Sequence, residues 1–562
     1  MADQKNESGH RNMKRGLVPP RAPRQALLAL MAVAAGAATG QASGPATPAP
    51  AARATPPMAA SAPTPVFAIR GFRIEGENPI GEAQAQRVLA PFVRPNATLE
   101  TLQQATAAFE AALRAGGYGL HRVALPPQEV GDTVKLQVVK FTIGKVGIDG
   151  AQIYDAGNIR RTLPELREGD SPNFKTLAIQ TAIANENPNK QVQVGLRESE
   201  EPDRIDATIT VREQRPWTFG VALSNAGSEA TGRDRFTITG GHTNLFNLDH
   251  QFVGAYTTSF ERTDDVKQLG LSYKVPLYAL GGVLGASYTR SDVVGNFGAF
   301  TSTGAGRTFG VNYTMYLAPE GGRRSYVTVG IDDKLFEAGI VDIGGLAIPV
   351  NTDRRSRPVT IGYTARTETD TAIWGYNVDL AWNTGAGSNN DLPSYQSEDP
   401  RIDRVHWKAV RGAASYTAPL ATTWLWSARG MFQVSPDVLI SGEQFGLGGI
   451  GSVRGTDIDR PVTGDSGLSA TLELTSPEFV PGLRALGFVD AGYVRNHKPD
   501  VLNPSSDRLA SVGLGMRYTR GPFAAAVDYG RIVVGSRVPL AAYPSSPQRG
   551  DDRLYVTLSL RF

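Results

Sequence analysis

The chain has 562 residues, with 57 Lys and Arg against 54 Asp and Glu and no cysteine. The absence of cysteine excludes a disulfide scaffold, a Cys-ligated zinc site, an iron–sulfur protein and a thiol nucleophile. The basic excess of +3 is concentrated in residues 1–42, so it does not indicate a nucleic-acid surface. No apolar run reaches the roughly 20 residues of a spanning helix, which excludes a helical membrane protein.

Residues 1–42 have the pattern of a secretory signal peptide. A basic leader precedes the short apolar stretch 26–38, and Gly40 and Ala42 supply small residues before the predicted cleavage point. Residues 43–65 are rich in Pro and Ala, a composition that cannot build a core, and we predict a linker there.

Residues 66–140 and 141–213 are predicted to form two small α/β modules, each with the order strand, helix, helix, strand, strand. In the first module, we expect strands at 67–75, 120–125 and 134–139, and helices within 81–93 and 99–115. In the second, we expect strands at 141–148, 191–196 and 204–212, and helices at 155–163 and 173–187.

Residues 214–562 lose the helical period and alternate apolar with polar side chains. In residues 374–382, for example, Trp374, Tyr376, Val378, Leu380 and Trp382 share one face. Strands of about ten residues that end in Tyr or Trp suit a bilayer with aromatic girdles. The length suits a transmembrane β-barrel of about 16 antiparallel strands, although about 12 or about 18 would also fit.

The chain end strengthens the barrel prediction. In residues 554–562, apolar side chains alternate with Thr, Ser and Arg, and the last residue is Phe562. A final strand that ends in Phe resembles the signature by which bacterial outer-membrane barrels are recognised for insertion. We therefore expect Phe562 to be the barrel-assembly signal.

Three patterns resemble catalytic or ligand sites, but none is supported by its surroundings. Residues 464–467 (GDSG) match the nucleophile motif of trypsin-like proteases, yet no histidine stands in the setting that this mechanism needs. Residues 446–451 match GxGxxG, but no helix is expected after them to receive a pyrophosphate. The six histidines show no metal-ligand spacing. We expect no enzyme, no cofactor and no metal.

Residues 438–460 distinguish between the possible classes of outer-membrane protein. In this segment Gly448 and Gly449 are followed by Val453, Arg454 and Gly455. This segment resembles the sixth loop of the two-partner secretion transporters, the haemolysin and filamentous-adhesin secretion/activation protein family of the POTRA–barrel superfamily. Other matching stretches are 126–128, 187–194, 244–251, 273–277 and 488–490. The resemblance covers about 67–562, and it implies two periplasmic POTRA domains before a 16-stranded outer-membrane barrel, with a loop near 446–460 inserted into the lumen.

The sequence departs from the family in two places. Thr456 stands where the family usually has Tyr or Phe after Val-Arg-Gly. Many members begin with a helix that plugs the barrel. Residues 43–65 are too rich in Pro for a long helix, so the presence of a plug helix in this chain stays an open question.

Alternation over residues 484–493 directs Phe488 and Asp490 to the lumen. A lumenal carboxylate beside an inserted Arg454 would form a charge-assisted, bidentate contact, which we interpret as a latch; the alternative is that Arg454 is an ordinary solvated loop residue. An exposed pair contributes about 0–1 kcal/mol, and burial makes it costlier to break. Asp528, a second lumenal carboxylate, is expected to matter less.

The resemblance implies an outer-membrane pore that recognises a secreted partner protein through its POTRA domains and translocates it unfolded to the cell surface. The expected partners are a haemolysin- or adhesin-like protein, outer-membrane lipid and the barrel-assembly machinery, with no nucleic acid. The alternatives are a barrel-assembly insertase, which usually carries more POTRA modules, and a passive porin or receptor. The sequence names neither the exported protein nor the oligomeric state.

Overall fold

A computed structural model describes residues 66–129, 131–343, 346–421 and 423–562. The predicted signal peptide and linker, residues 1–65, lie outside the described residues. Among the described helices, none has the length and apolar character needed to cross a membrane.

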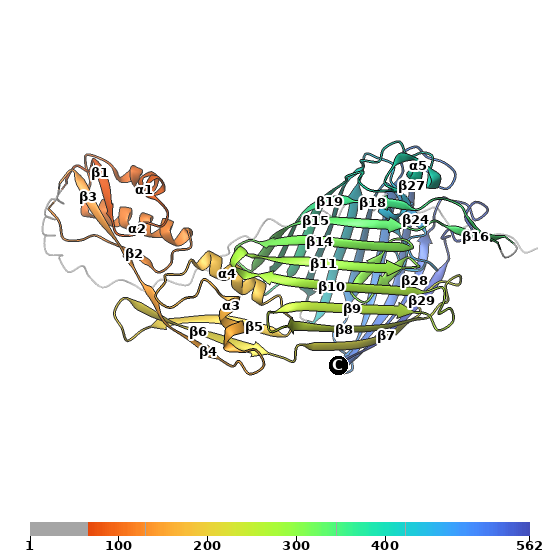
Figure 1. Cartoon of the computed structure of the whole chain (residues 1–562), viewed down its shortest axis with the longest axis horizontal. Coiled ribbons are helices and arrows are strands. Elements are labelled where there is room, and N and C mark those ends of the chain that lie inside the picture. The colour runs from red at the N-terminus through yellow and green to blue at the C-terminus, as the bar shows by residue number, and fades with distance from the viewer. Residues whose placement is uncertain (1–65, 130, 344–345, 422) are drawn as a thin grey trace, which may run out of the picture. The chain divides into compact units, whose positions relative to one another are not determined.

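The first module is a three-stranded sheet with two helices packed against it (Figure 1). Its elements are β1 (Gly71–Glu75), α1 (Glu82–Leu89), the 3-10 turn η1 (Ala90–Phe92), α2 (Leu99–Ala115), β2 (His121–Ala124) and β3 (Thr133–Lys140). The strand order is β1-β3-β2, with β1 parallel and β2 antiparallel to β3. The helix expected within 81–93 is split, because Pro91 has no N–H to continue the α-helical ladder.

The second module repeats this topology. Its elements are β4 (Thr142–Asp149), α3 (Ala156–Thr162), α4 (Phe174–Ala184), β5 (Lys190–Glu198) and β6 (Arg204–Glu213). The order is β4-β6-β5, so β5 lies at an edge of the described sheet. Helix α4 ends before the predicted residue 187, since the Asn185 side chain instead bonds both backbone groups of Val192 and ties the helix end to β5.

Most of the remaining strands form a closed antiparallel barrel of 16 strands, which confirms the predicted fold (Figure 1). They are β7 (Trp217–Ser224), β8 (Arg235–Leu245), β9 (His250–Thr258), β10 (Lys267–Leu277), β11 (Gly282–Ser291), β14 (Gly306–Tyr316), β15 (Arg323–Phe336), β18 (Arg354–Ser356) continued by β19 (Pro358–Glu368), β20 (Ile373–Asn383), β21 (Lys408–Leu420), β22 (Trp424–Val434), β25 (Ser466–Thr475), β26 (Leu483–Arg495), β27 (Ser506–Arg520), β28 (Phe523–Val534) and β29 (Asp552–Arg561). The barrel closes where β29 pairs with β7.

Side chains alternate between the two barrel faces as the period of two predicts. On β20, Tyr376 and Val378 face outward, and on β26, Val489 is exposed while Phe488 and Asp490 are buried. The outward rows are apolar, which suits contact with lipid.

The connections differ between the two ends of the barrel. At the end where the second module joins β7, the connections are short, such as η2 (Tyr278–Leu280) between β10 and β11. At the other end lie long loops that contain α5 (Leu392–Glu398), η3 (Ser441–Glu443) and the short strand pairs β12 (Gly295–Phe297) with β13 (Phe300–Ser302), β16 (Ile340–Ile343) with β17 (Leu346–Pro349), and β23 (Phe445–Leu447) with β24 (Val462–Gly464). This asymmetry is typical of outer-membrane barrels, whose short turns face the periplasm.

Candidate functional site in the barrel lumen

The sixth long loop, residues 435–465 between β22 and β25, folds back against the inner wall of the barrel. Its two arms pair as β23 and β24, and Leu447 and Val453 are fully buried with Val494 of β26. Gly448 and Gly449 adopt positive φ at the end of β23. A Cβ on Gly449 would lie 1.8 Å from a carboxylate oxygen of Asp459, so this bend requires glycine.

Arg454 and Asp490 are in contact and almost completely buried, with 3% and 0% of their surfaces exposed. Arg454 Nε lies 2.8 Å from Asp490 Oδ2 and Nη2 lies 2.9 Å from Oδ1, which makes the ion pair bidentate. The backbone N–H of Arg454 also donates to Oδ2 at 3.1 Å. The carboxylate thus holds both the side chain and the backbone of the loop.

Three further groups of the wall surround the Arg454 guanidinium. Glu473 of β25 accepts a hydrogen bond at 2.9 Å, and the ring of Phe488 lies 3.3 Å from the guanidinium carbon. Asp528 of β28 lies 3.6 Å from Nη1 and also pairs with Arg517 at 2.9 Å. The loop thus reaches far enough across the lumen to meet β28, and Asp528 belongs to the same group of charges; that its substitution matters less than that of Asp490 stays a prediction.

Close approach between the loop and β28 depends on a pair of glycines. Gly455 has φ +110°, and a Cβ there would lie 3.1 Å from the carbonyl oxygen of Gly530. A Cβ on Gly530 would in turn lie 3.0 Å from Arg454. Both positions thus favour glycine, which lets two stretches of backbone touch.

Thr456 bonds within the loop and to the wall. Its hydroxyl accepts from the Gly449 N–H at 2.7 Å and donates to the Ile458 carbonyl at 2.9 Å. Its own carbonyl accepts from the Tyr555 hydroxyl at 2.8 Å. Since only 3% of its surface is exposed, Thr456 fastens the loop tip without an aromatic ring.

The root of the sixth loop is tied to the barrel wall and to neighbouring surface loops. Buried Glu443 pairs with Lys334 of β15 at 3.1 Å and Arg411 of β21 at 2.8 Å. Asp465 accepts hydrogen bonds from the backbone N–H groups of Leu439 and His497, and so joins two loops.

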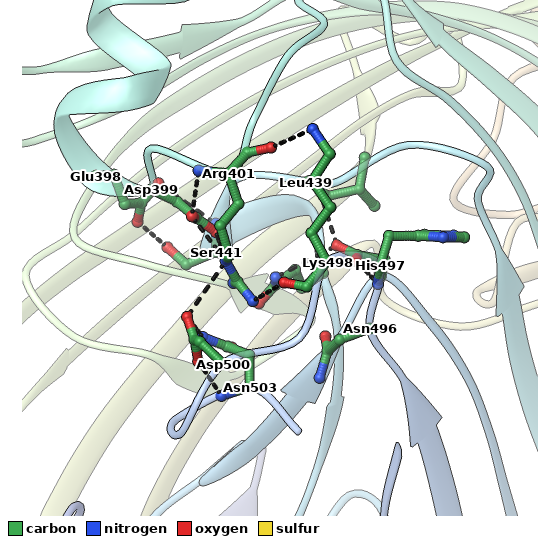
Figure 2. Close-up of polar contacts among 12 residues, drawn as sticks. Glu398, Asp399, Arg401, Leu439, Ser441, Asn496, His497, Lys498, Asp500 and Asn503 are labelled. Carbon is green, nitrogen blue, oxygen red and sulfur yellow. Dashed lines mark hydrogen bonds and ion pairs between the residues drawn. The ribbon is translucent and has the colours of Figure 1, made fainter. Parts of the chain in front are cut away.

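A second polar cluster joins the loop that carries α5 to the loop between β26 and β27 (Figure 2). Arg401 bonds Asp399 at 2.7 Å and lies 3.4 Å from Asp500, and Lys498 donates to the Arg401 carbonyl at 3.0 Å. Lys498 also bonds the Asp403 carboxylate, which lowers the pKa of that group. These loops therefore hold one another at the outer end of the barrel.

Phe562 lies at the barrel seam. Its backbone N–H donates to the Phe219 carbonyl at 2.8 Å, and the two rings are 5.9 Å apart. The Phe562 side chain is 68% exposed on the outside. Its role as an assembly signal stays a prediction.

The residues of the patterns that resemble catalytic sites form hydrogen bonds that hold loops and strand ends together. Ser466 of the GDSG segment donates to the Ser435 carbonyl, and His497 Nε2 lies 2.9 Å from the same oxygen rather than from a serine hydroxyl. The GxGxxG segment forms the end of the β23–β24 pair. No cluster of three or more potential metal ligands occurs in the described part of the chain.

Comparisons with known proteins agree with this architecture. Residues 204–518, more than half of the chain, match the family "Haemolysin secretion/activation protein ShlB/FhaC/HecB", and residues 67–140 match the ShlB-type POTRA domain. The chain is 24% identical to the outer membrane transporter CdiB of Dickeya dadantii (strain 3937) over 85% of this chain and 87% of that one, and 23% identical to CdiB of Escherichia coli over 81% and 77%.

The fold is also similar to a solved structure of CdiB from Escherichia coli, with a TM-score of 0.69 and 19% identity over 90% of this chain and 93% of that one. The chain therefore belongs to the haemolysin secretion/activation protein family ShlB/FhaC/HecB and is an outer-membrane transporter of two-partner secretion.

Proposed function

We propose that residues 66–140 and 141–213 are the two POTRA domains that bind the exported chain, and that residues 214–562 form the barrel through which it passes. The barrel lies in the outer membrane, the POTRA domains lie in the periplasm, and the transporter acts with a secreted partner protein. We infer a haemolysin- or adhesin-like partner, assembly by the barrel-assembly machinery, and no enzymatic step.

Capture of the partner is supported by a groove on the second POTRA domain. The groove has a volume of about 550 Å³ and runs between α4 and the edge strand β5. Its lining is largely apolar and includes Leu177, Ala178, Thr181, Val192, Val194 and Leu196. An extended polypeptide can pair with such a strand edge and place alternate side chains in the groove.

Control of the pore rests on the contact between Arg454 and Asp490, which is the observation that carries the proposal. The sixth loop occupies the lumen, and this buried pair holds its tip to the wall. Removing one partner of a buried ion pair costs about 3–5 kcal/mol, so the closed state is stable until an entering chain replaces these contacts. Because no nucleotide site was found in the sequence, we infer that folding of the exported protein outside supplies the direction.

The test is deletion of this gene in its host, followed by mass spectrometry of the surface and secreted proteins. We expect one large secreted protein to disappear while other outer-membrane barrels keep their abundance. Loss of many barrels would point to an insertase, and no loss of any secreted protein would point to a passive pore. Complementation with Arg454→Ala is expected to restore the barrel but not the export.

A further inference from the structure

Two arginines lie side by side on the outer surface of the barrel, at the end that carries the long loops. Arg290 of β11 and Arg307 of β14 are direct partners in the antiparallel ladder, and both are exposed. They share the outward face with Leu284 of β11 and Phe309 of β14, which are 41% and 52% exposed. The Cβ atoms of such partners are about 4.5–5.5 Å apart. The fold therefore holds two positive charges close together on the outer wall.

This pair of like charges has no counter-charge of its own. Among the residues that the structure describes, no acidic side chain forms an ion pair with Arg290 or Arg307. The outward carboxylate on the next strand, Asp333 of β15, is bound instead by Arg355 at 3.5 Å and by Arg357 at 3.1 Å. Like charges directly opposite each other destabilise a sheet, so the arrangement indicates an anion that comes from outside the chain.

The positive charge continues across the neighbouring strands, which lie side by side in the wall (Figure 1). Leu335 of β15 is the ladder partner of Arg307, and Arg355 of β18 is the partner of Leu335. Four arginines thus share the single carboxylate of Asp333. We call Arg290, Arg307, Arg355 and Arg357 the outer arginine surface.

The wall between the outer arginine surface and the middle of the barrel is apolar. Tyr288 and Phe309 are ladder partners one step further along the outward face, and Leu271 of β10 lies opposite Tyr288. Val311 and Ile331 continue this face. Such outward rows contact the hydrocarbon of the membrane. A ligand at this place therefore meets guanidinium groups at its head and apolar side chains along its body, which describes an anionic lipid.

The end of the barrel identifies the leaflet that supplies this lipid. The long loops lie at the cell surface, whereas the short turns face the periplasm. The lipid beside the outer arginine surface is therefore the glycolipid of the outer leaflet, whose sugar head carries phosphate groups. The planar guanidinium group binds phosphate through two parallel hydrogen bonds.

We propose that the outer arginine surface is a binding site for the phosphorylated head of lipopolysaccharide, and that the acyl chains lie along the apolar wall below it. The inference goes beyond the proposed function, because it depends on the outer-membrane location and not on the exported protein. The opposite side of the barrel lacks such a site. There Arg531 of β28 is also exposed, but its ladder partner is Asp552 of β29, so a carboxylate already balances its charge.

The site is testable by native mass spectrometry of the full chain, purified in detergent and titrated with rough-type lipopolysaccharide. A cation near a membrane surface contributes about a fivefold gain in affinity for anionic lipid. Arg290→Gln and Arg307→Gln are each expected to weaken binding about fivefold, and the double change about twenty-fivefold. Arg531→Gln removes an outward arginine at the same end of the barrel and is the matched control, expected to leave binding unchanged.

Two further lipids test the chemistry and the leaflet. Lipopolysaccharide from which the phosphates have been removed is expected to bind the wild-type chain weakly. Phosphatidylglycerol, an anionic lipid of the periplasmic leaflet, is expected to displace lipopolysaccharide poorly. Equal binding of the dephosphorylated lipid, equal displacement by phosphatidylglycerol, or wild-type affinity of the double variant would each overturn the proposal.

Arg307→Glu separates lipid binding from folding. It places a carboxylate opposite Arg290, which is a favourable cross-strand pair. The thermal stability of the lipid-free barrel is therefore expected to equal or exceed that of the wild type, while lipopolysaccharide binding is lost. Retained binding in this variant would overturn the proposal. A loss of stability together with binding would assign the two arginines a structural role, and would overturn it as well.

Discussion

Removing Arg454 is expected to release the sixth loop more completely than removing Asp490. In Arg454→Ala, Glu473 still forms its ion pair with Arg429 at 3.2 Å, and Asp528 still forms its ion pair with Arg517. Asp490 is left at 0% exposure, and of its partners only the Ser511 hydroxyl at 3.4 Å and the backbone N–H of residue 454 remain. The lone buried carboxylate makes this the costly substitution.

The free energy that each substitution costs the closed loop follows from the contacts that remain in that variant. Arg454→Ala breaks a buried pair and forfeits the contact with the Phe488 ring, which together cost about 3–5 kcal/mol. Asp490→Ala removes hydrogen bonds to a charged group, but Arg454 still has Glu473, so the cost is about 1.5–3 kcal/mol. Asp490→Asn keeps an acceptor and is expected to fall between wild type and Asp490→Ala. Since both residues act in one contact, the double variant is expected to be no worse than Arg454→Ala.

Hydrogen exchange of a peptide that spans 446–460, in membrane-reconstituted protein, measures the release directly. Each 1.4 kcal/mol is about a tenfold change in an equilibrium, so Arg454→Ala is expected to speed exchange by about a hundredfold or more, with loss of export and an intact barrel. Asp379→Ala, which removes a lumenal carboxylate bonded to Asn377, is the matched control. Unchanged exchange in Arg454→Ala, or strictly additive effects in the double variant, would refute the latch.

Three further predictions concern other parts of the chain. Deletion of Phe562, or Phe562→Lys, is expected to reduce barrel assembly, and unchanged heat-modifiable migration on gels would contradict this. Residues 66–213 are expected to fold as a soluble fragment with native-like circular dichroism, whereas persistent insolubility would count against two autonomous domains. Burial lowers the pKa of His121 below 6.5, more than Glu77 raises it, so protonation favours the unfolded state. The thermal stability of that fragment is therefore expected to fall as pH drops from 7 to 5, and His121→Gln is expected to flatten the dependence.

The sequence predicted the strand faces because side-chain direction has a fixed period of two in a strand. Alternation alone directed Phe488 and Asp490 to the lumen, and the resemblance supplied Arg454 as the group that meets them. The same alternation also directs Glu473 inward, between outward Leu472 and Leu474. Periodicity gives the face of a residue and not its height along the barrel, which depends on strand register and on the path of the loop.

A buried ion pair joins Lys190 of β5 to Asp249, in the turn between β8 and β9, with Nζ and Oδ2 2.5 Å apart. It could not be predicted, because it depends on contacts between residues far apart in the chain. Lysine is almost never fully buried unless it is paired, so Lys190 at the start of an alternating strand indicates a solvated position. Its partner Asp249 is 59 residues away, in a turn whose left-handed backbone no local motif specifies. The family resemblance marked both segments without indicating that they touch.

The energetics favour a moving loop inside a barrel that keeps its shape. Strands β26 and β27 are paired from Leu483 to Arg495, and separating such a ladder forfeits many hydrogen bonds, each with a net value of about 0.5–1.5 kcal/mol. The tip of the sixth loop is held to the wall by a few groups, chiefly the Arg454 cluster, the Tyr555 hydroxyl and Arg553, which pairs with Asp457 at 2.6 Å. An entering polypeptide can replace such polar contacts one at a time with its own backbone groups. We therefore expect passage through the lumen to require release of the loop tip and to leave the strand pairing intact.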